Sequence, residues 1–134
     1  MKILIQSAKI ICKGSPYHLK KKNVLIAGGR IAEIGDKNYQ ADKVINAEGM
    51  LLSIGWIDLG AFVGDPGLEH KEDLVSIGKA AAAGGFTELV LLPNTHPTIQ
   101  TKNEVSHITQ GNNNRLVQLH VMAAVTKNCK GEEL

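Results

Sequence analysis

The chain has 134 residues, of which 43% are hydrophobic and 21% are charged, and its formal net charge is +2. These values exclude a strongly charged disordered tail, which would contain fewer apolar residues and carry a larger net charge. The length corresponds to one domain or slightly less. Because aromatic residues make up only 4% of the chain, we expect a core built from Ile, Leu, Val and Ala.

The charge pattern favours neither nucleic acid nor a membrane as a partner. Lys20–Lys22 is the only basic cluster, and no aromatic residue is interleaved with it, so a solvated loop is the favoured interpretation. No apolar run reaches the ~18 residues of a membrane-spanning helix, and the N-terminal stretch is too interrupted for a signal peptide. Cys12 and Cys129 form no CxxC motif, which is typical of reduced thiols. The predicted location is the cytoplasm.

The first part of the chain, residues 1–53, is predicted to form a small antiparallel β unit. Short β-branched or alternating runs are separated by turn signals at intervals of about 8–12 residues. Gly28–Gly29 and Glu48–Gly49 are the clearest of these turns. The predicted strands cover residues 2–5, 9–12, 23–27, 30–34, 44–46 and 50–52.

From residue 54 onward, the pattern changes to alternating strands and helices. Strands are predicted at residues 54–59, 87–92 and 116–125, helices at 70–83 and 101–110, and the start of a third helix at 130–134. Thr101 and Glu104 have the spacing of a capping box, and Gly111 with Asn112–Asn114 is predicted to end the second helix. This order is typical of a parallel sheet with right-handed crossovers. Functional sites of such sheets form at the carboxyl ends of the strands, here residues 58–62, 93–95 and 123–126.

A family resemblance is carried by four stretches that follow one another in matching order. They are GGRIAEIG at 28–35, SIGWIDLGAFVGDPGLEHKEDL at 53–74, AAAAGGFTELVLLPNTHP at 80–97 and AAVTKNCKGEEL at 123–134. Together they resemble the first part of a dihydroorotase, a member of the amidohydrolase superfamily, of the longer type that carries a β-sandwich beside its barrel. The PG-x-E-x-KEDL stretch, followed by AAAAGGFT and PNT-x-P, is specific to this branch.

The resemblance implies an α/β fold in which residues 54–134 are the start of a (β/α)8 TIM barrel, about three β/α units, preceded by part of a small β-sandwich at residues 1–53. A complete barrel takes ~250 residues, so the chain is expected to be a fragment. An open three-stranded sheet would expose apolar faces and two edges. We therefore expect the chain to self-associate as a homo-oligomer.

The main departure from the family lies at the end of the first barrel strand. The family pattern there is I-D-x-H-x-H followed by an arginine, and the resemblance implies that the histidines bind zinc and the arginine binds the substrate carboxylate. Gly60 and Phe62 occupy the two ligand positions in this chain, and Gly64 occupies the arginine position. Glycine and phenylalanine offer no donor atom to a metal. We therefore predict no catalytic residue, no metal ligand and no cofactor in this chain, although zinc is the cofactor of the family.

The polar residues near the strand ends allow more than one interpretation. The resemblance implies that Asn94 contacts the substrate, whereas the residues alone favour equally a side chain that caps a turn before Pro97. His96 is the best spare ligand candidate, but an ordinary loop histidine is favoured. His120 is predicted to pack its ring against a helix, and Asp58 to form a hydrogen bond near the end of its strand.

The functional prediction is a dihydroorotase-like protein of pyrimidine biosynthesis, in a family of cyclic amide hydrolases. Such hydrolysis uses a metal-bound hydroxide, so the missing donors predict a non-catalytic protein, for which the resemblance implies a role as a structural partner of aspartate carbamoyltransferase. One alternative is an active parent enzyme with a relocated metal site or another cyclic-amide substrate. The other is an interaction protein that keeps the fold without the metal, like the dihydropyrimidinase-like proteins.

Overall fold

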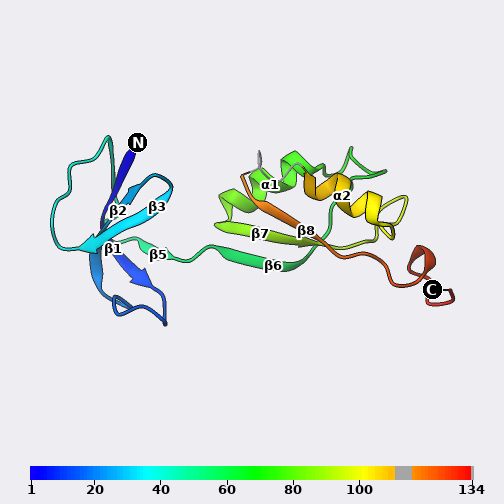
Figure 1. Ribbon diagram of the computed structural model, residues 1–134, viewed down its shortest axis with the longest axis horizontal. Helices are drawn as coiled ribbons and strands as arrows, with labels where there is room; N and C mark the ends of the chain where they lie inside the picture. Colours follow the sequence, from blue (N-terminus) through cyan, green and yellow to red (C-terminus); the bar gives the residue numbers. More distant parts are fainter. Residues whose placement is uncertain (111–115, 134) are drawn as a thin grey trace. The chain divides into compact units, whose positions relative to one another are not determined.

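The structure is a computed structural model that describes residues 1–110 and 116–133. The residues predicted to end the second helix, Gly111 and Asn112–Asn114, lie outside the described part. The chain divides into two compact units, which are Met1–Ile54 (unit 1) and Gly55–Leu134 (unit 2) (Figure 1). No described helix is long and apolar enough to cross a membrane.

Unit 1 is a mixed five-stranded sheet whose strand order is β3-β2-β1-β4, with β5 also pairing with β1. Its strands are β1 (Lys2–Ile11), β2 (Lys21–Ala27), β3 (Arg30–Gly35), β4 (Lys43–Asn46) and β5 (Leu51–Ser53). β1, β2 and β3 are antiparallel, as predicted. β4 and β5, however, run parallel to β1, so the prediction of a purely antiparallel unit was wrong for these two strands.

The physical reason is that β4 and β5 lie one after the other along the same edge of β1, so the chain does not turn back between them. β4 pairs with the first half of β1 and β5 with its second half. Between them the chain stays bound to β1, because Ala47 donates its N–H to Gln6 O and Met50 O accepts from Lys9 N–H. The predicted turn at Glu48–Gly49 is therefore a local excursion and does not reverse the chain as a hairpin would.

β1 is one strand with an irregularity between Ile5 and Ala8, where two separate strands were predicted. Ser7 has a φ of 64° at this point, a conformation that is uncommon outside glycine. Its N–H donates to Asn23 Oδ1 at 2.8 Å, and Asn23 Nδ2 donates to Lys37 O at 2.9 Å. Asn23 is only 8% exposed, so a buried amide side chain satisfies the backbone at the irregular position.

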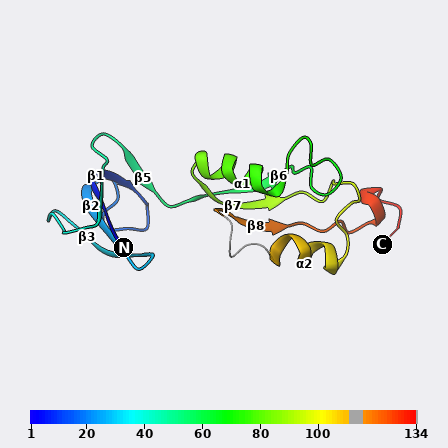
Figure 2. The same cartoon turned by 90° about the horizontal axis from the view of Figure 1, so that it is seen from above.

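Unit 2 is a three-stranded parallel sheet in the order β6-β7-β8, with a helix in each crossover. Its elements are β6 (Trp56–Ala61), α1 (Leu74–Ala83), β7 (Phe86–Leu91), α2 (Lys102–Gln110), β8 (Gln118–Val121) and the short 3-10 helix η2 (Lys127–Cys129). Both helices lie on the same side of the sheet (Figures 1 and 2). The predicted alternation of parallel strands and helices is confirmed.

The core of unit 2 lies between the helices and one face of the sheet. Leu89, Leu91 and Leu119 from the strands pack with Ile77 from α1 and Ile108 from α2. Apart from Phe86, which is partly buried against it, this core is aliphatic, as the scarcity of aromatic residues predicts. The opposite face of the sheet carries no helix among the described residues (Figure 1).

The beginning of each helix is determined by an acidic side chain. Asp73 Oδ1 accepts from the N–H groups of Val75 at 2.8 Å and Ser76 at 2.7 Å, so α1 begins at Leu74 and not at the predicted residue 70. Glu104 Oε2 accepts from Thr101 N–H at 2.7 Å, and Glu104 N–H reaches Thr101 Oγ1 at 3.4 Å. The predicted capping box of the second helix is confirmed.

The C-terminal part of unit 2 differs from the sequence prediction. The third strand is β8, which covers only Gln118–Val121 of the predicted residues 116–125. Residues 130–133 are not helical, so the start of a third helix predicted there was wrong as far as the structure describes it. Asn128 and Cys129, which lie within the short η2, have φ angles of 54° and 57°, and such left-handed residues do not continue into a right-handed helix.

The capping carboxylates make the stability of unit 2 depend on pH. The N–H groups of Ser76 and Val75 hold the pKa of Asp73 below its usual value, and those of Gln100 and Thr101 do the same for Glu104. Because these folded-state pKa values lie below the unfolded ones, the stabilisation is complete above about pH 4 to 4.5 and is lost as the pH falls further.

We expect Asp73→Asn to weaken this dependence, because asparagine also caps helices but does not titrate. The difference in Tm between pH 7 and pH 3, followed by circular dichroism, will be smaller for Asp73→Asn than for the parent chain. An equal loss of Tm in both proteins would contradict a contribution from Asp73.

Candidate functional site

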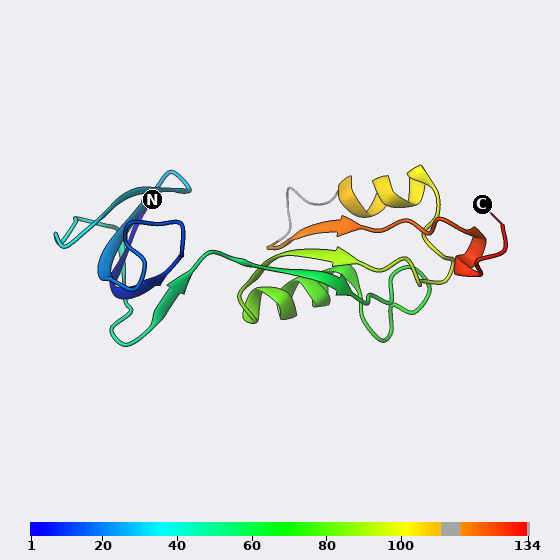
Figure 3. The same ribbon diagram turned by 90° about the horizontal axis from the view of Figure 1, so that it is seen from below.

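The carboxyl ends of the three parallel strands of unit 2 meet at one edge (Figure 3). Leu92 donates its N–H to Ala61 O at 2.9 Å, and Met122 donates to Leu91 O at 3.0 Å. The backbone pairing thus continues one residue past the ends of β7 and β8 and holds the three strand ends side by side. This edge is where the sequence predicts functional residues.

Gly60 and Phe62, the two positions at which the sequence resemblance predicts zinc ligands, lie at the end of β6. A Cβ atom at Gly60 would meet no other atom within 4 Å. The pairing of β6 with β7 is irregular between Asp58 and Ala61, and Gly60 N–H donates to Asp58 Oδ1 at 3.0 Å in this irregular stretch. The hydrogen bond predicted for Asp58 is therefore present.

The residues at this edge do not fit a zinc ion. Gly60 offers no side chain, and Phe62, whose surface is 43% exposed, offers a phenyl ring without a donor atom. Among residues 1–110 and 116–133, no group of three or more His, Cys, Asp or Glu is arranged to hold a metal ion. No step of a reaction through zinc can therefore be assigned to residues of the described chain.

Gly64, the position at which the sequence resemblance predicts an arginine, is buried in the loop after β6. Its N–H donates to Glu72 O at 3.0 Å, and its carbonyl oxygen accepts from Leu68 N–H at 2.5 Å. A Cβ atom at Gly64 would lie 2.7 Å from Glu72 O. The chain is folded back on itself here and leaves no space for a side chain.

The loop after β6 is also joined to the loop after β7. His96 donates its backbone N–H to Pro66 O at 3.0 Å. Gly67, with a φ of 100°, lies so close to the His96 carbonyl that a Cβ atom there would overlap it. Gly67 N–H also donates to Glu69 Oε1 at 2.8 Å, and this bond lowers the pKa of Glu69 below its usual value. The two loops therefore hold each other through backbone contacts.

In the PNTHP loop after β7, one polar side chain is buried and another is exposed. Thr95 is buried, and its Oγ1 donates to Pro97 O at 2.7 Å. Asn94 is exposed and makes no side-chain hydrogen bond to the residues that the structure describes. The contact across the turn before Pro97 thus comes from Thr95, and a substrate contact from Asn94 stays a prediction.

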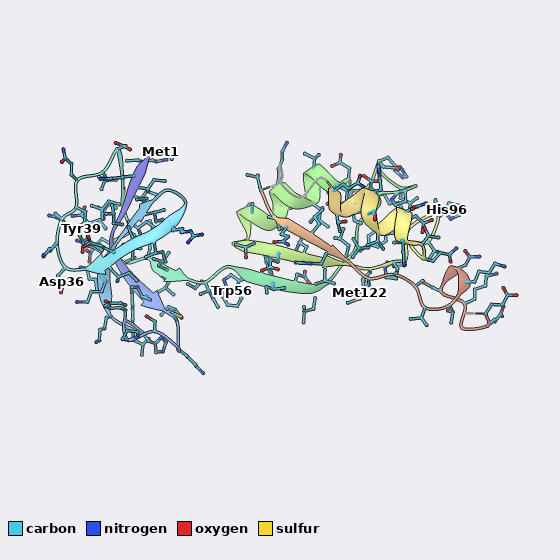
Figure 4. The ribbon with its side chains drawn as sticks, viewed as in Figure 1. Met1, Asp36, Tyr39, Trp56, His96 and Met122 are labelled. Atoms are coloured by element: carbon cyan, nitrogen blue, oxygen red, sulfur yellow. The ribbon has the colours of Figure 1, made fainter. Side chains whose placement is uncertain are left out.

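His96 is exposed and lies at the loop end of unit 2, at the opposite end from Trp56 (Figure 4). Within the described residues, it belongs to no group of three or more His, Cys, Asp or Glu that could hold a metal ion. An exposed loop histidine is the interpretation that the sequence favoured for this residue.

One pair of ionisable side chains was missed by the sequence interpretation. His120 Nε2 lies 2.7 Å from Glu88 Oε2, and the two side chains are 43% and 37% exposed. Leu89 and Leu119, the chain neighbours of these residues, face the helices, so the alternation along the strands directs Glu88 and His120 to the opposite face. The prediction that the His120 ring packs against a helix was wrong. The alternation with the neighbouring leucines could have shown that Glu88 and His120 face away from the helices. Their contact could not be predicted, because the pairing of β7 with β8 was not known from the sequence.

Comparison with known proteins shows that this chain is similar to dihydroorotases. No family model matches the chain. The chain is 36% identical over 139 aligned residues to the dihydroorotase of Citrifermentans bemidjiense, with 100% of the chain and 32% of that protein aligned. It is 38% identical over 138 residues to the dihydroorotase of Syntrophotalea carbinolica, again over 100% of the chain and 32% of that protein. The chain thus spans about a third of the length of these relatives.

Solved structures agree on the fold. The L-hydantoinase (dihydropyrimidinase) from Arthrobacter aurescens matches with a TM-score of 0.77 at 19% identity, covering 92% of this chain and 28% of that one. A D-hydantoinase structure matches with a TM-score of 0.71 at 23% identity, covering 94% and 28%. The chain is therefore a relative of the dihydroorotases, with the fold seen in hydantoinases, and corresponds to an N-terminal portion of such a protein.

Proposed function

We propose that this chain is a non-catalytic, dihydroorotase-like portion of a protein of pyrimidine biosynthesis. The observation that carries the proposal is the absence of donor atoms at Gly60 and Phe62, at the carboxyl edge of the parallel sheet. The surrounding scaffold supports the proposal, since the three parallel strands and the two helices between them are formed.

The chemistry of amide hydrolysis explains why these positions matter. A metal ion generates a hydroxide nucleophile near neutral pH and polarises the carbonyl group under attack. An arginine can in addition hold a substrate carboxylate through two parallel charge-assisted hydrogen bonds. The described edge offers neither a histidine pair nor an arginine, and Asn94 is, with His96, an exposed polar side chain of the loop after β7 that a ligand could contact.

The direct test is metal analysis and a dihydroorotate assay on the purified protein that contains this chain. We expect a zinc content well below one ion per chain and no hydrolysis or ring closure above the uncatalysed rate. One zinc ion per chain together with turnover would overturn the proposal. That result would favour instead an active cyclic amidohydrolase with a relocated metal site.

Partners are a second part of the proposal. The apolar face of unit 1 lines a groove of about 230 Å³ through Ile5, Val24, Ile26 and Leu52, and in unit 2 Ile57 and Leu59 are 52% and 72% exposed. Such surfaces favour association with further protein. We propose self-association and, from the dihydroorotase relationship, binding to aspartate carbamoyltransferase. Light scattering after size-exclusion chromatography tests both, and a monomer that does not co-elute with the transferase would reject them.

A further inference from the structure

The loop after β6, residues 64–72, closes on itself through its own backbone. Gly64 N–H donates to Glu72 O at 3.0 Å, Leu68 N–H donates to Gly64 O at 2.5 Å, and Lys71 N–H donates to Leu68 O at 2.8 Å. These bonds draw the two ends of the loop together, and Gly64 is buried between them.

Position 64 has no room for a side chain in this arrangement. A Cβ atom would lie 2.7 Å from Glu72 O and 2.8 Å from the carbonyl carbon of Leu68, and closer still to Leu68 O. All three are backbone atoms, which cannot rotate away as the end of a flexible side chain can. Glycine is required here by space alone, because Gly64 does not adopt a left-handed backbone conformation.

Gly60 provides a contrast within the same short stretch of chain. It also replaces a functional residue of the family, but a Cβ atom there would meet nothing within 4 Å. The two glycines are therefore not equivalent. Gly60 leaves space for a side chain at the edge of the sheet, whereas Gly64 is required by the close packing of the loop.

The loop is also held from outside. Pro66 O accepts the backbone N–H of His96 at 3.0 Å, and the close approach of Gly67 to the His96 carbonyl leaves no space between the two loops. A change of conformation that opened space at Gly64 would have to break these contacts as well. The closed form is thus supported by the loop after β7.

We propose that residues 64–72 form a self-closed strap at the carboxyl end of β6, in which the carbonyl groups of Leu68 and Glu72 occupy the place that a side chain at position 64 would need. This inference rests on the proposed function and deepens it. New donor atoms at positions 60 and 62 can be accommodated, whereas a cationic side chain at position 64 cannot. Position 64 therefore contributes no positive charge to a ligand at this edge, and a ligand carboxylate has no cationic partner at position 64.

A matched pair of glycine substitutions tests the strap. We expect Gly64→Ala to lower Tm by roughly 5 °C or more, because one added carbon overpacks a closed backbone. Gly60→Ala is the control and should leave Tm unchanged or slightly raised, because the site is open and alanine restricts the unfolded chain. Equal Tm values for the two variants, measured by circular dichroism, would overturn the proposal.

Amide hydrogen exchange on the unmodified chain gives a second test that holds even if Gly64→Ala fails to fold. The N–H groups of Gly64 and Leu68 should exchange at least roughly tenfold more slowly than in a free peptide, because both are bonded inside the strap. Exchange at the free-peptide rate would reject the strap. Neither measurement involves zinc or turnover, so the strap can fail while the non-catalytic proposal stands.

Discussion

The double substitution Gly60→His and Phe62→His will raise the affinity of the chain for zinc by at least about tenfold, or about 1.4 kcal/mol. Imidazole nitrogens are good zinc ligands, whereas the parent presents a bare backbone and a phenyl ring at these positions. The scaffold can accept the change, because the space at Gly60 is open and Phe62 is 43% exposed. Titration calorimetry with zinc at pH 7.5 measures the affinity directly.

The pH dependence and a matched control make this prediction specific. Zinc binds neutral imidazole, so the gain in affinity should shrink as the pH falls below about 6.5. Gly60→Ala combined with Phe62→Ala changes the same positions without adding a donor and should bind zinc no better than the parent. If the histidine and alanine variants bound zinc equally, positions 60 and 62 would not form a ligand pair. Adding Gly64→Arg should lower Tm without a further gain in zinc affinity.

Leu91→Ala will lower the free energy of unfolding of unit 2 by about 2–5 kcal/mol. Leu91 is fully buried in the central strand β7 and packs in the cluster that also contains Ile99, Ile108 and Leu119. Removing its branched end leaves a cavity between the sheet and the helices, which the surrounding side chains fill only in part. Urea unfolding followed by circular dichroism measures the change.

Leu59→Ala is the matched control, because Leu59 lies on the edge strand β6 and is 72% exposed. We expect its effect to stay within about 0.5 kcal/mol. Because Leu91 belongs to the core of unit 2, amide protection of β1 and β2 in unit 1 should be preserved in Leu91→Ala. If the two leucine variants lost equal stability, the helix-covered face of the sheet would not be the core.

Local patterns in the sequence were sufficient where structure depends on residues close together in the chain. The alternation of strands and helices in unit 2 could be predicted, since helical and strand periodicities differ within a few residues. The capping box of Thr101 and Glu104 was predictable for the same reason. Such patterns place an element but not its exact limits, since the cap at Asp73 starts α1 at Leu74 and not at the predicted residue 70.

The relationship of the chain to its relatives was also available from sequence, because motifs in matching order cover its whole length. The same motifs predict that Gly60, Phe62 and Gly64 depart from the family pattern. They do not tell these positions apart, because a sequence shows which side chain is missing and not whether there is space for one.

Other features were decided only by the tertiary structure, because they depend on contacts between segments that are distant in the sequence. The parallel course of β4 and β5 beside β1 follows from pairing across about 40 residues, and the contact of Glu88 with His120 follows from the register of β7 with β8. The sequence by itself determined the β/α alternation, the relationship to dihydroorotases and the absence of donor atoms at positions 60 and 62. The fold decided that Gly60 is open and Gly64 closed, because backbone atoms of residues 68 and 72 fill the space beside only one of them.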